Sequence, residues 1–472
     1  MCYTMISIIV TRISFLIVLI SIFGWVCCGC SSEPEPGTDE PRLPETETGT
    51  TETIVVKPIA HSIAQDSIVD AKNTTSLTIS YSSPISISQI NLISLNDRVV
   101  TTATASNNTL VIPLSLEPLT HYILKVLPGA LSAGDNTTVN SFTLKFKTKA
   151  TINLNNIATG LCNVNASKSA KAVYQYFLSI YGKSTVSGVI EPTFNSCDYS
   201  SLIQSTTKQL PATIEYCIQD IHTTSYNDIS NITSHQAGGG IVAINWQWAT
   251  PSLENDSPEN YSVDSNFNLK NALRDDKWEF QFVENDFNII AKTLQQLKDN
   301  DIVVLFNPMR MAQNHWWGKL DAIYFRELWR LMYDRLAIKH RLDNIIWVWS
   351  TESANLTKEE LKNWYPGDEY VDIIGTNSYA DNTNSQIDRF LLLNETFEGR
   401  KMLAITECGN IPDIPKCHDM GDTWLYFSSM YATNSDGTLS LDRIFKLNSS
   451  IHWNTLMNHQ KVITRDEFSI FK

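Results

Sequence analysis

The chain has 472 residues, of which 43% are apolar, 18% charged and 10% aromatic, a composition typical of a folded globular protein and not of a disordered or collagen-like one. Its 36 lysines and arginines against 50 aspartates and glutamates give a formal net charge of −14, so the average surface field repels a phosphate backbone. We therefore expect no nucleic-acid partner.

The first 30 residues form a separate segment, in which an almost wholly apolar run over residues 13–26 follows Arg12. This run is too short for a comfortable membrane span and is typical of a signal peptide. Cys30 follows a glycine and directly precedes an acidic, Pro- and Thr-rich stretch over residues 31–53. The arrangement resembles bacterial lipoprotein signals, which implies lipidation of Cys30, a disordered linker, and anchoring to the outer membrane at the cell surface. An ordinary signal peptide or an uncleaved anchor is the alternative.

Residues 54–149 alternate apolar and polar positions in short segments such as SLTISYS, TLVIPLS and SFTLKFKT, which polar turns separate. Period-two alternation with frequent turns predicts an antiparallel β-sandwich. The stretch LEPLTHYILKVLPGALSAGD resembles the end of bacterial immunoglobulin-like domains. Because no titratable groups cluster in this segment, we expect a spacer rather than a binding module.

From residue 150 to residue 472, apolar strands alternate with amphipathic helices, a pattern typical of parallel βαβ units. Helices are expected at residues 169–182, 287–299 and 324–338. Seven apolar runs read as buried strands, with an eighth at residues 424–431: 185–192, 211–217, 241–248, 302–308, 344–350, 371–379 and 402–407. We therefore predict an α/β fold, a (β/α)8 TIM barrel whose functional residues sit at the C-terminal ends of the strands.

The cysteines after Cys30 do not indicate a metal site. They lack any CxxC pair and have no histidine cluster nearby, so we expect neither a metal nor a cofactor. Their number is odd, so at least one is a free thiol, and the spacing does not decide which of them pair: Cys162, Cys197, Cys217, Cys408 and Cys417.

Two residues at the ends of predicted strands are candidates for function. Glu407 closes the apolar run MLAIT and precedes Gly409, so it is expected to point from a strand end into the mouth of the barrel. This position favours a catalytic or ligand-binding role over a structural one. Tyr379 ends the run VDIIGTNS, and a satisfied core hydroxyl is nearly as good an interpretation of it.

Between Ala166 and Glu467 the sequence contains the motifs YGKSTVSG, LFNPMRMAQNHWWG, LDNIIWVWS, WYPGDEYVDIIGTNSY, AITECGNIP and NHQKVITRDE. Together these motifs resemble glycoside hydrolase family 26, most of whose members are endo-β-mannanases. In that family two glutamates act as a retaining pair, one as the nucleophile and the other as the acid/base. The resemblance implies that Glu407 is the nucleophile and that Tyr379 is its hydrogen-bond partner.

The acid/base glutamate is missing from its family position. The fourth strand of the family ends in Arg-Pro-x-His-Glu, whereas this sequence has Asn307, Pro308, Met309, Arg310 and Met311. A thioether has no ionisable proton, so Met311 cannot act as a general acid. Shifting the alignment supplies no substitute, because residues 302–318 contain neither aspartate nor glutamate.

The sequence retains tryptophans of the family pattern close to the replaced residues. Gln247 stands where the family has a histidine, but the tryptophans on both sides of it remain. We expect indole faces at the barrel mouth to stack on sugar rings. The expected substrate-binding residues are Trp246, Gln247, Trp248, Asn307, Arg310, Trp316 and Trp317.

The sequence thus keeps the nucleophile position and the aromatic residues of the family but lacks its acid/base glutamate. Two main functional hypotheses follow. In the first, a lipid-anchored protein binds β-mannan or a related polysaccharide without cutting it. In the second, the chain is an active retaining β-mannanase in which Glu191, Glu215 or Glu352 supplies the proton. Binding is favoured, because losing general acid catalysis lowers a rate by about 10² to 10⁴. A purely structural surface protein is a third hypothesis.

Overall fold

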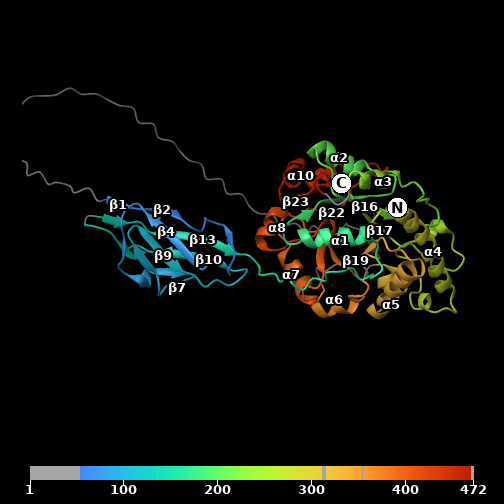
Figure 1. The fold of residues 1–472 in the computed structure, drawn as a ribbon, viewed down its shortest axis with the longest axis horizontal. Coiled ribbons are helices and arrows are strands. Elements are labelled where there is room, and N and C mark those ends of the chain that lie inside the picture. The colour runs from blue at the N-terminus through green and yellow to red at the C-terminus, as the bar shows by residue number, and fades with distance from the viewer. Residues whose placement is uncertain (1–53, 136, 311–314, 352–355, 469–472) are drawn as a thin grey trace, which may run out of the picture. The chain divides into compact units, whose positions relative to one another are not determined.

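The computed structural model describes residues 54–135, 137–310, 315–351 and 356–468 (Figure 1). The predicted signal peptide, Cys30 and the linker lie outside these residues, and so do Met311 and Glu352. Within the described part of the chain, no helix has both the length and the apolar character needed to cross a membrane.

Residues 54–149 form two β-sheets around one shared core. In a central strand the buried side chains of Leu77, Ile79 and Tyr81 alternate with those of Thr78 and Ser80, which are partly exposed. Apolar side chains from both sheets pack in a single hydrophobic cluster. The alternation in the sequence therefore matches the alternation in burial, because successive side chains of a strand point to opposite faces.

The larger sheet has the order β3 (Ile68–Val69), β13 (Phe142–Thr148), β10 (His121–Val126), β6 (Ile93–Leu95) and β7 (Arg98–Val99). The smaller sheet has the order β2 (Pro58–His61), β4 (Ser76–Tyr81), β9 (Thr109–Pro113) and β8 (Thr104–Ser106). Two short pairs join β1 (Ile54–Val56) to β12 (Thr137–Val139) and β5 (Ser86–Ile87) to β11 (Leu131–Ser132).

Eight parallel strands close into a barrel, which confirms the predicted (β/α)8 TIM fold. All their residues are buried except Glu407, because the barrel interior covers one face of each strand and the helices cover the other. This double burial explains the continuous apolar runs in the sequence. The strands are β15 (Gly188–Glu191), β16 (Thr213–Ile218), β17 (Ile241–Trp246), β18 (Val304–Pro308), β19 (Ile345–Thr351), β20 (Ile373–Ser378), β21 (Met402–Cys408) and β22 (Phe427–Ser429).

Figure 1 shows the helices α2 to α8 arranged around the central strands. A further short pair, β14 (Thr185–Val186) with β23 (Val462–Ile463), lies outside the closed barrel. The α-helices are α1 (Lys168–Ile180), α2 (Asp198–Thr207), α3 (Ser230–Ala237), α4 (Trp278–Asp299), α5 (Ala322–Tyr333), α6 (Lys358–Trp364), α7 (Ile387–Thr396), α8 (Ile414–Met420), α9 (Leu441–Leu447) and α10 (Ser450–Met457).

Two helices differ from the sequence prediction in length or geometry. Helix α4 begins at Trp278, nine positions before the expected residue 287, so its first turns carry aromatic side chains that the prediction assigned to no element. The helix expected over residues 324–338 is α-helical only to Tyr333 and continues as a π-helix over Asp334–Lys339.

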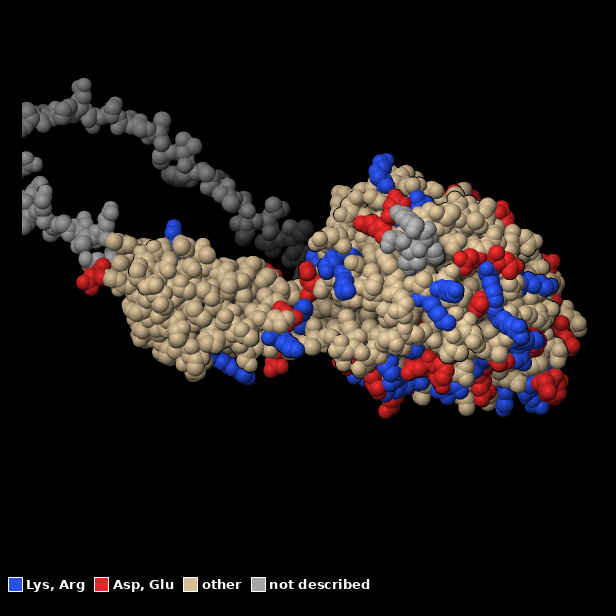
Figure 2. Space-filling model, viewed as in Figure 1, with Lys and Arg blue, Asp and Glu red and all other residues tan. Residues whose placement is uncertain are grey.

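Charged side chains of both signs are interspersed on the barrel face drawn in Figure 2, whereas the face of residues 54–149 seen there carries few charges. Interspersed charges do not build a single-sign field that would attract a strongly charged polymer. On this face, the surface suits a neutral ligand better than a charged one.

Candidate active site

The strand ends of the barrel bring Arg310, Tyr379 and Glu407 into one cluster with Glu215. Tyr379 directly follows β20, and Glu407 is the second-last residue of β21, the strand paired with β20. Because parallel strands share one C-terminal edge, both side chains start from the same end of the barrel. Arg310 lies two residues beyond β18, and Glu215 lies inside β16. Four residues that the sequence singled out separately thus form one site.

Both oxygens of the Glu407 carboxylate accept hydrogen bonds. Its Oε2 accepts from Nη1 of Arg310 at 2.6 Å, and its Oε1 accepts from the Tyr379 hydroxyl. The Glu407 side chain is 12% exposed, so it remains reachable from the barrel mouth. A fixed, reachable carboxylate at a strand end has the geometry that attack on an anomeric carbon requires. The contact with Tyr379 is the one that the family resemblance implies.

Arg310 also forms an ion pair with Glu215, so one guanidinium joins two carboxylates. Arg310 is only 5% exposed, and Glu215 is fully buried. Charges removed from water to this degree are tolerated when they are paired, and the planar arginine fork suits carboxylates in particular. Glu215 was a candidate for the relocated acid, but in this arrangement it is the counter-ion of Arg310. Its carboxylate is therefore engaged by a guanidinium and does not face a bound ligand alone.

The backbone turns just before Arg310, which directs this side chain into the cluster. Met309 has a φ of 51°, in the left-handed region that residues other than glycine rarely adopt. Asn307, with its amide oriented so that both groups are bonded, accepts from Nε of Arg310 at 3.0 Å and donates to Oγ of Ser350 at 2.9 Å. Backbone strain of this kind, about 1 kcal/mol, persists only where surrounding contacts fix it. The predicted residues Asn307 and Arg310 therefore contact each other.

Tyr379 stays a hydrogen-bond donor throughout the neutral range. Burial, followed by the neighbouring Glu407 carboxylate, raises the pKa of its phenol above the usual value, even though 44% of the residue is exposed. The exposed part of the ring faces solvent beside a carboxylate that the hydroxyl holds in place. Tyr379 is thus both an orienting group and an accessible aromatic surface.

The second candidate acid, Glu191, is occupied at the start of α2. Its carboxylate accepts from the main-chain N–H groups of Ser200 at 2.7 Å and Tyr199 at 3.4 Å, and from the hydroxyl of Ser196 at 2.7 Å. Glu191 is fully buried. A carboxylate in this position satisfies the free N–H groups of a helix start and interacts favourably with its dipole. Glu191 therefore holds the β15–α2 connection together.

The expectation of open indole faces is corrected by the structure. Trp246, Trp248, Trp316 and Trp317 are each at most 1% exposed. Trp246 stacks on Trp248 with ring centroids 4.3 Å apart, and Trp248 meets Trp316 edge to face at 5.2 Å. The Trp316 N–H donates to the Trp248 carbonyl at 2.8 Å. These four side chains belong to the hydrophobic core beneath the site, because other protein atoms cover their ring faces.

Gln247 and the cysteines are the remaining residues that the sequence analysis singled out. Gln247 is partly buried after β17, and its main-chain N–H donates to the Ile218 carbonyl at 2.8 Å. The five cysteines within the described residues are free. Burial raises the pKa of Cys217, which lies on β16 near the site, to about 12, so it is a thiol and not a thiolate at neutral pH.

Sequence reasoning missed the pairing of Glu215 with Arg310. The signal was present, since Glu215 interrupts the apolar run PATIEYC, and a charge inside a barrel strand needs a partner. Which residue is that partner depends on how the barrel closes, so it could not be predicted from the strand sequence alone.

A closed (β/α)8 barrel with a hydrogen-bonded glutamate at a strand end is the architecture of barrel glycoside hydrolases. The model of glycosyl hydrolase family 26 matches residues 162–467, which is more than half of the chain. The chain belongs to this family.

Relatives and solved structures agree with this assignment. A mannan endo-1,4-β-mannosidase of Thermothelomyces thermophilus is 29% identical over 289 residues, which are 58% of this chain and 57% of that protein. The chain thus spans little more than half the length of this relative. Among solved structures, the family 26 domain of an endo-β-mannanase/endo-β-glucanase from Prevotella bryantii is 27% identical, with a TM-score of 0.59, over 66% of this chain and all of that domain.

A β-mannanase from a symbiotic protist of the termite Reticulitermes speratus was solved with a gluco-manno-oligosaccharide. It is 27% identical to this chain, with a TM-score of 0.56, over 66% of this chain and 98% of that one. The family match over residues 162–467 contains all eight barrel strands and the cluster around Glu407.

Proposed function

We propose that this family 26 protein binds β-mannan or a closely related neutral polysaccharide in its barrel cleft with little or no hydrolysis. Met311 stands at the acid/base position in the sequence and has no ionisable proton. The observation that carries the proposal is that Arg310 holds both Glu215 and Glu407 as paired carboxylates. The family and its mannan-degrading relatives support β-mannan as the ligand.

The second candidate function is an active retaining endo-β-1,4-mannanase with a relocated acid. Of the three carboxylates considered, Glu215 is bound to Arg310 and Glu191 is bound to the start of α2. Glu352 follows β19 and lies outside the described residues. Glu352 is therefore the remaining candidate for a proton donor in this second reading.

Binding without cleavage is the expected result with soluble β-mannan. Calorimetry should detect association, and a reducing-end assay on the same mixture should show no increase over buffer during the time in which an active relative digests the polymer. The affinity should change little between low and physiological salt, because sugar contacts do not depend on counter-ion release. Fast release of reducing ends that persists in Glu407→Gln would point to a contaminating enzyme, whereas loss of this release in Glu352→Gln would establish the active reading.

We further propose that residues 54–149 form an immunoglobulin-like spacer and that lipidated Cys30 anchors the chain to the outer face of a bacterial membrane. The two-sheet core and the scarcity of charge on its visible face support a spacer role. The apolar run before Cys30 and the acidic stretch after it support export and anchoring.

The anchor is tested by replacing the lipidated cysteine. Cys30→Ser should move the protein from the membrane fraction to the soluble fraction, since stable anchoring needs two or more acyl chains. Fractionation with immunoblotting measures this shift, with Cys197→Ser as the matched control, because that exposed thiol lies in the barrel domain. Membrane retention of Cys30→Ser would indicate an uncleaved apolar segment instead.

A further inference from the structure

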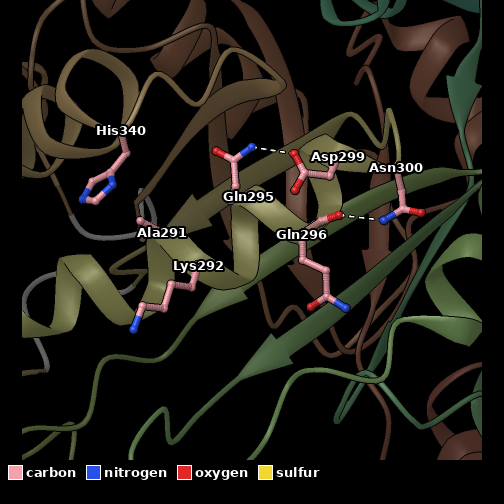
Figure 3. A pocket seen from close by; sticks show the side chains of 7 residues that line it. All are labelled: Ala291, Lys292, Gln295, Gln296, Asp299, Asn300 and His340. Atoms are coloured by element: carbon pink, nitrogen blue, oxygen red, sulfur yellow. Dashed lines mark hydrogen bonds between the residues drawn. The ribbon is translucent and has the colours of Figure 1, made fainter.

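Helix α4 carries two surface hollows of similar size with different chemistry. The first, of about 410 Å³, lies along the C-terminal half of the helix and is drawn in Figure 3. Its side-chain amides are hydrogen-bonded within the protein: Gln295 donates to the Asp299 carboxylate at 2.7 Å, Asn300 to the Gln296 carbonyl at 2.8 Å, and Gln296 to the Asn227 carbonyl at 2.7 Å. It presents no tryptophan, tyrosine or phenylalanine, so nothing in it suits a sugar ring.

The second hollow, of about 470 Å³, lies at the start of α4 and is lined by two aromatic side chains, three acidic ones, Lys277 and Gln281. Trp278 and Phe282 are partly exposed here, one helical turn apart. Gln281 is exposed beside them, and the carboxylates of Glu254 and Asp275 have no ion-pair partner among the described residues. An apolar ring face beside free hydrogen-bond acceptors is the combination that sugar rings, with apolar C–H faces and hydroxyl donors, require.

This hollow lies at the same end of the barrel as the cluster around Glu407. In a (β/α)8 barrel each helix runs back against the preceding strand, so α4 begins at the edge where β17 ends. Aromatic contacts connect the two places: Trp278 meets Phe267 at 5.5 Å, Phe267 meets Trp316 at 4.9 Å, and Trp316 meets Trp248 at 5.2 Å. Trp278 is the partly exposed end of a chain of packed aromatic rings that begins at the buried end of β17.

Phe282, one of the two aromatic side chains of the hollow, is packed against neighbouring rings. Phe282 packs against Tyr261 at 5.5 Å and His222 at 5.3 Å. Nε2 of His222 lies 2.9 Å from Oδ1 of the buried Asp286, whose Oδ2 accepts from the Trp248 N–H at 2.7 Å. A ring fixed in this way loses little conformational freedom when a ligand covers it.

We propose that the hollow at the start of α4 is a distal glycan subsite, in which Trp278 stacks on a sugar unit of a β-mannan chain whose other units occupy the cleft at Glu407. This inference rests on the proposed function. An anionic ligand is disfavoured here, because the carboxylates of Glu254 and Asp275, unpaired among the described residues, would repel it. Lys277 in the same lining is paired with Asp276. A neutral polymer of many identical units is favoured, since one chain can reach both places at once.

The test compares long and short ligands in the full chain. Trp278→Ala should weaken binding of β-mannan polymer about three- to tenfold and leave the affinity for mannobiose unchanged, because a disaccharide occupies the cleft alone. Trp278→Phe should retain most of the polymer affinity, and Gln281→Ala, at an exposed position, should weaken it without disturbing the fold. The matched control is Gln295→Ala in the other hollow, which should bind like the wild type.

The outcomes separate this inference from the proposed function. Unchanged polymer affinity in Trp278→Ala and Gln281→Ala, with normal binding by the wild type, would overturn the distal subsite alone. Equal weakening for the polymer and for mannobiose would place Trp278 in the cleft and overturn it as well. Absence of β-mannan binding by the wild type would overturn the proposed function, and the subsite with it.

Discussion

Replacing Arg310 with methionine should cost about 3 to 5 kcal/mol of barrel stability, the usual effect of removing one partner from a buried ion pair. The change leaves the fully buried Glu215 and the nearly buried Glu407 without their shared cation. Two carboxylates near one another would then have to be desolvated or protonated. Urea unfolding followed by tryptophan fluorescence measures the loss in the barrel alone, because every tryptophan after Trp25 lies within residues 150–472.

A double variant makes the ion-pair interpretation specific. Adding Glu215→Gln to Arg310→Met removes the buried carboxylate that has lost its partner. The double variant should therefore lose clearly less stability than the sum of the losses in the two single variants. Arg310→Lys keeps the charge but not the planar fork and should fall between wild type and Arg310→Met. Additive losses, or an Arg310→Met variant within about 0.5 kcal/mol of wild type, would mean that the ion pairs contribute nothing to folding.

An activated glycoside should glycosylate Glu407 even though the polymer stays intact. In a 2-fluoro mannoside with an acidic phenol, the Glu407 carboxylate attacks the anomeric carbon while the C–O bond to the phenol breaks and phenolate leaves with the electron pair. This leaving group needs no proton, so the missing acid, worth about 10² to 10⁴ in rate, does not matter for this step. Intact-protein mass spectrometry should show one added glycosyl unit, and peptide mapping should locate it on Glu407.

An ester formed from a mannoside without the fluorine should persist as well, because Met311 cannot deprotonate water. With the corresponding non-fluorinated aryl mannoside, azide should raise turnover, since it attacks without losing a proton. Glu407→Gln is the matched control and should take up no label. Met311→Glu should restore little mannan cleavage, because Gln247, Asn307 and Arg310 still differ from the family pattern. Absence of any adduct would show that Glu407 is held as a structural ion in its pair with Arg310.

The sequence by itself determined the barrel and singled out Glu407 at the end of one of its strands. Parallel strands that are buried on both faces are apolar along their whole length. Each strand could therefore be predicted from its own continuous apolar run, without knowing which strands lie beside it. Glu407 was recognised for the same local reason, since it ends such a run and opens onto a loop. The methionine at position 311, where the family motif has glutamate, was also visible in the sequence, because it requires only an alignment of the motif.

Only the tertiary structure decided what surrounds those positions. Arg310 and Glu407 are 97 positions apart, and nothing local to either one names the other as its partner. The tryptophans beside β17 and β18 looked suited to sugar stacking, but they are buried, because whether a ring face is open depends on the elements packed against it. Trp278 was overlooked for the converse reason: only the closure of the barrel places the start of α4 at the rim and leaves that ring partly exposed to solvent.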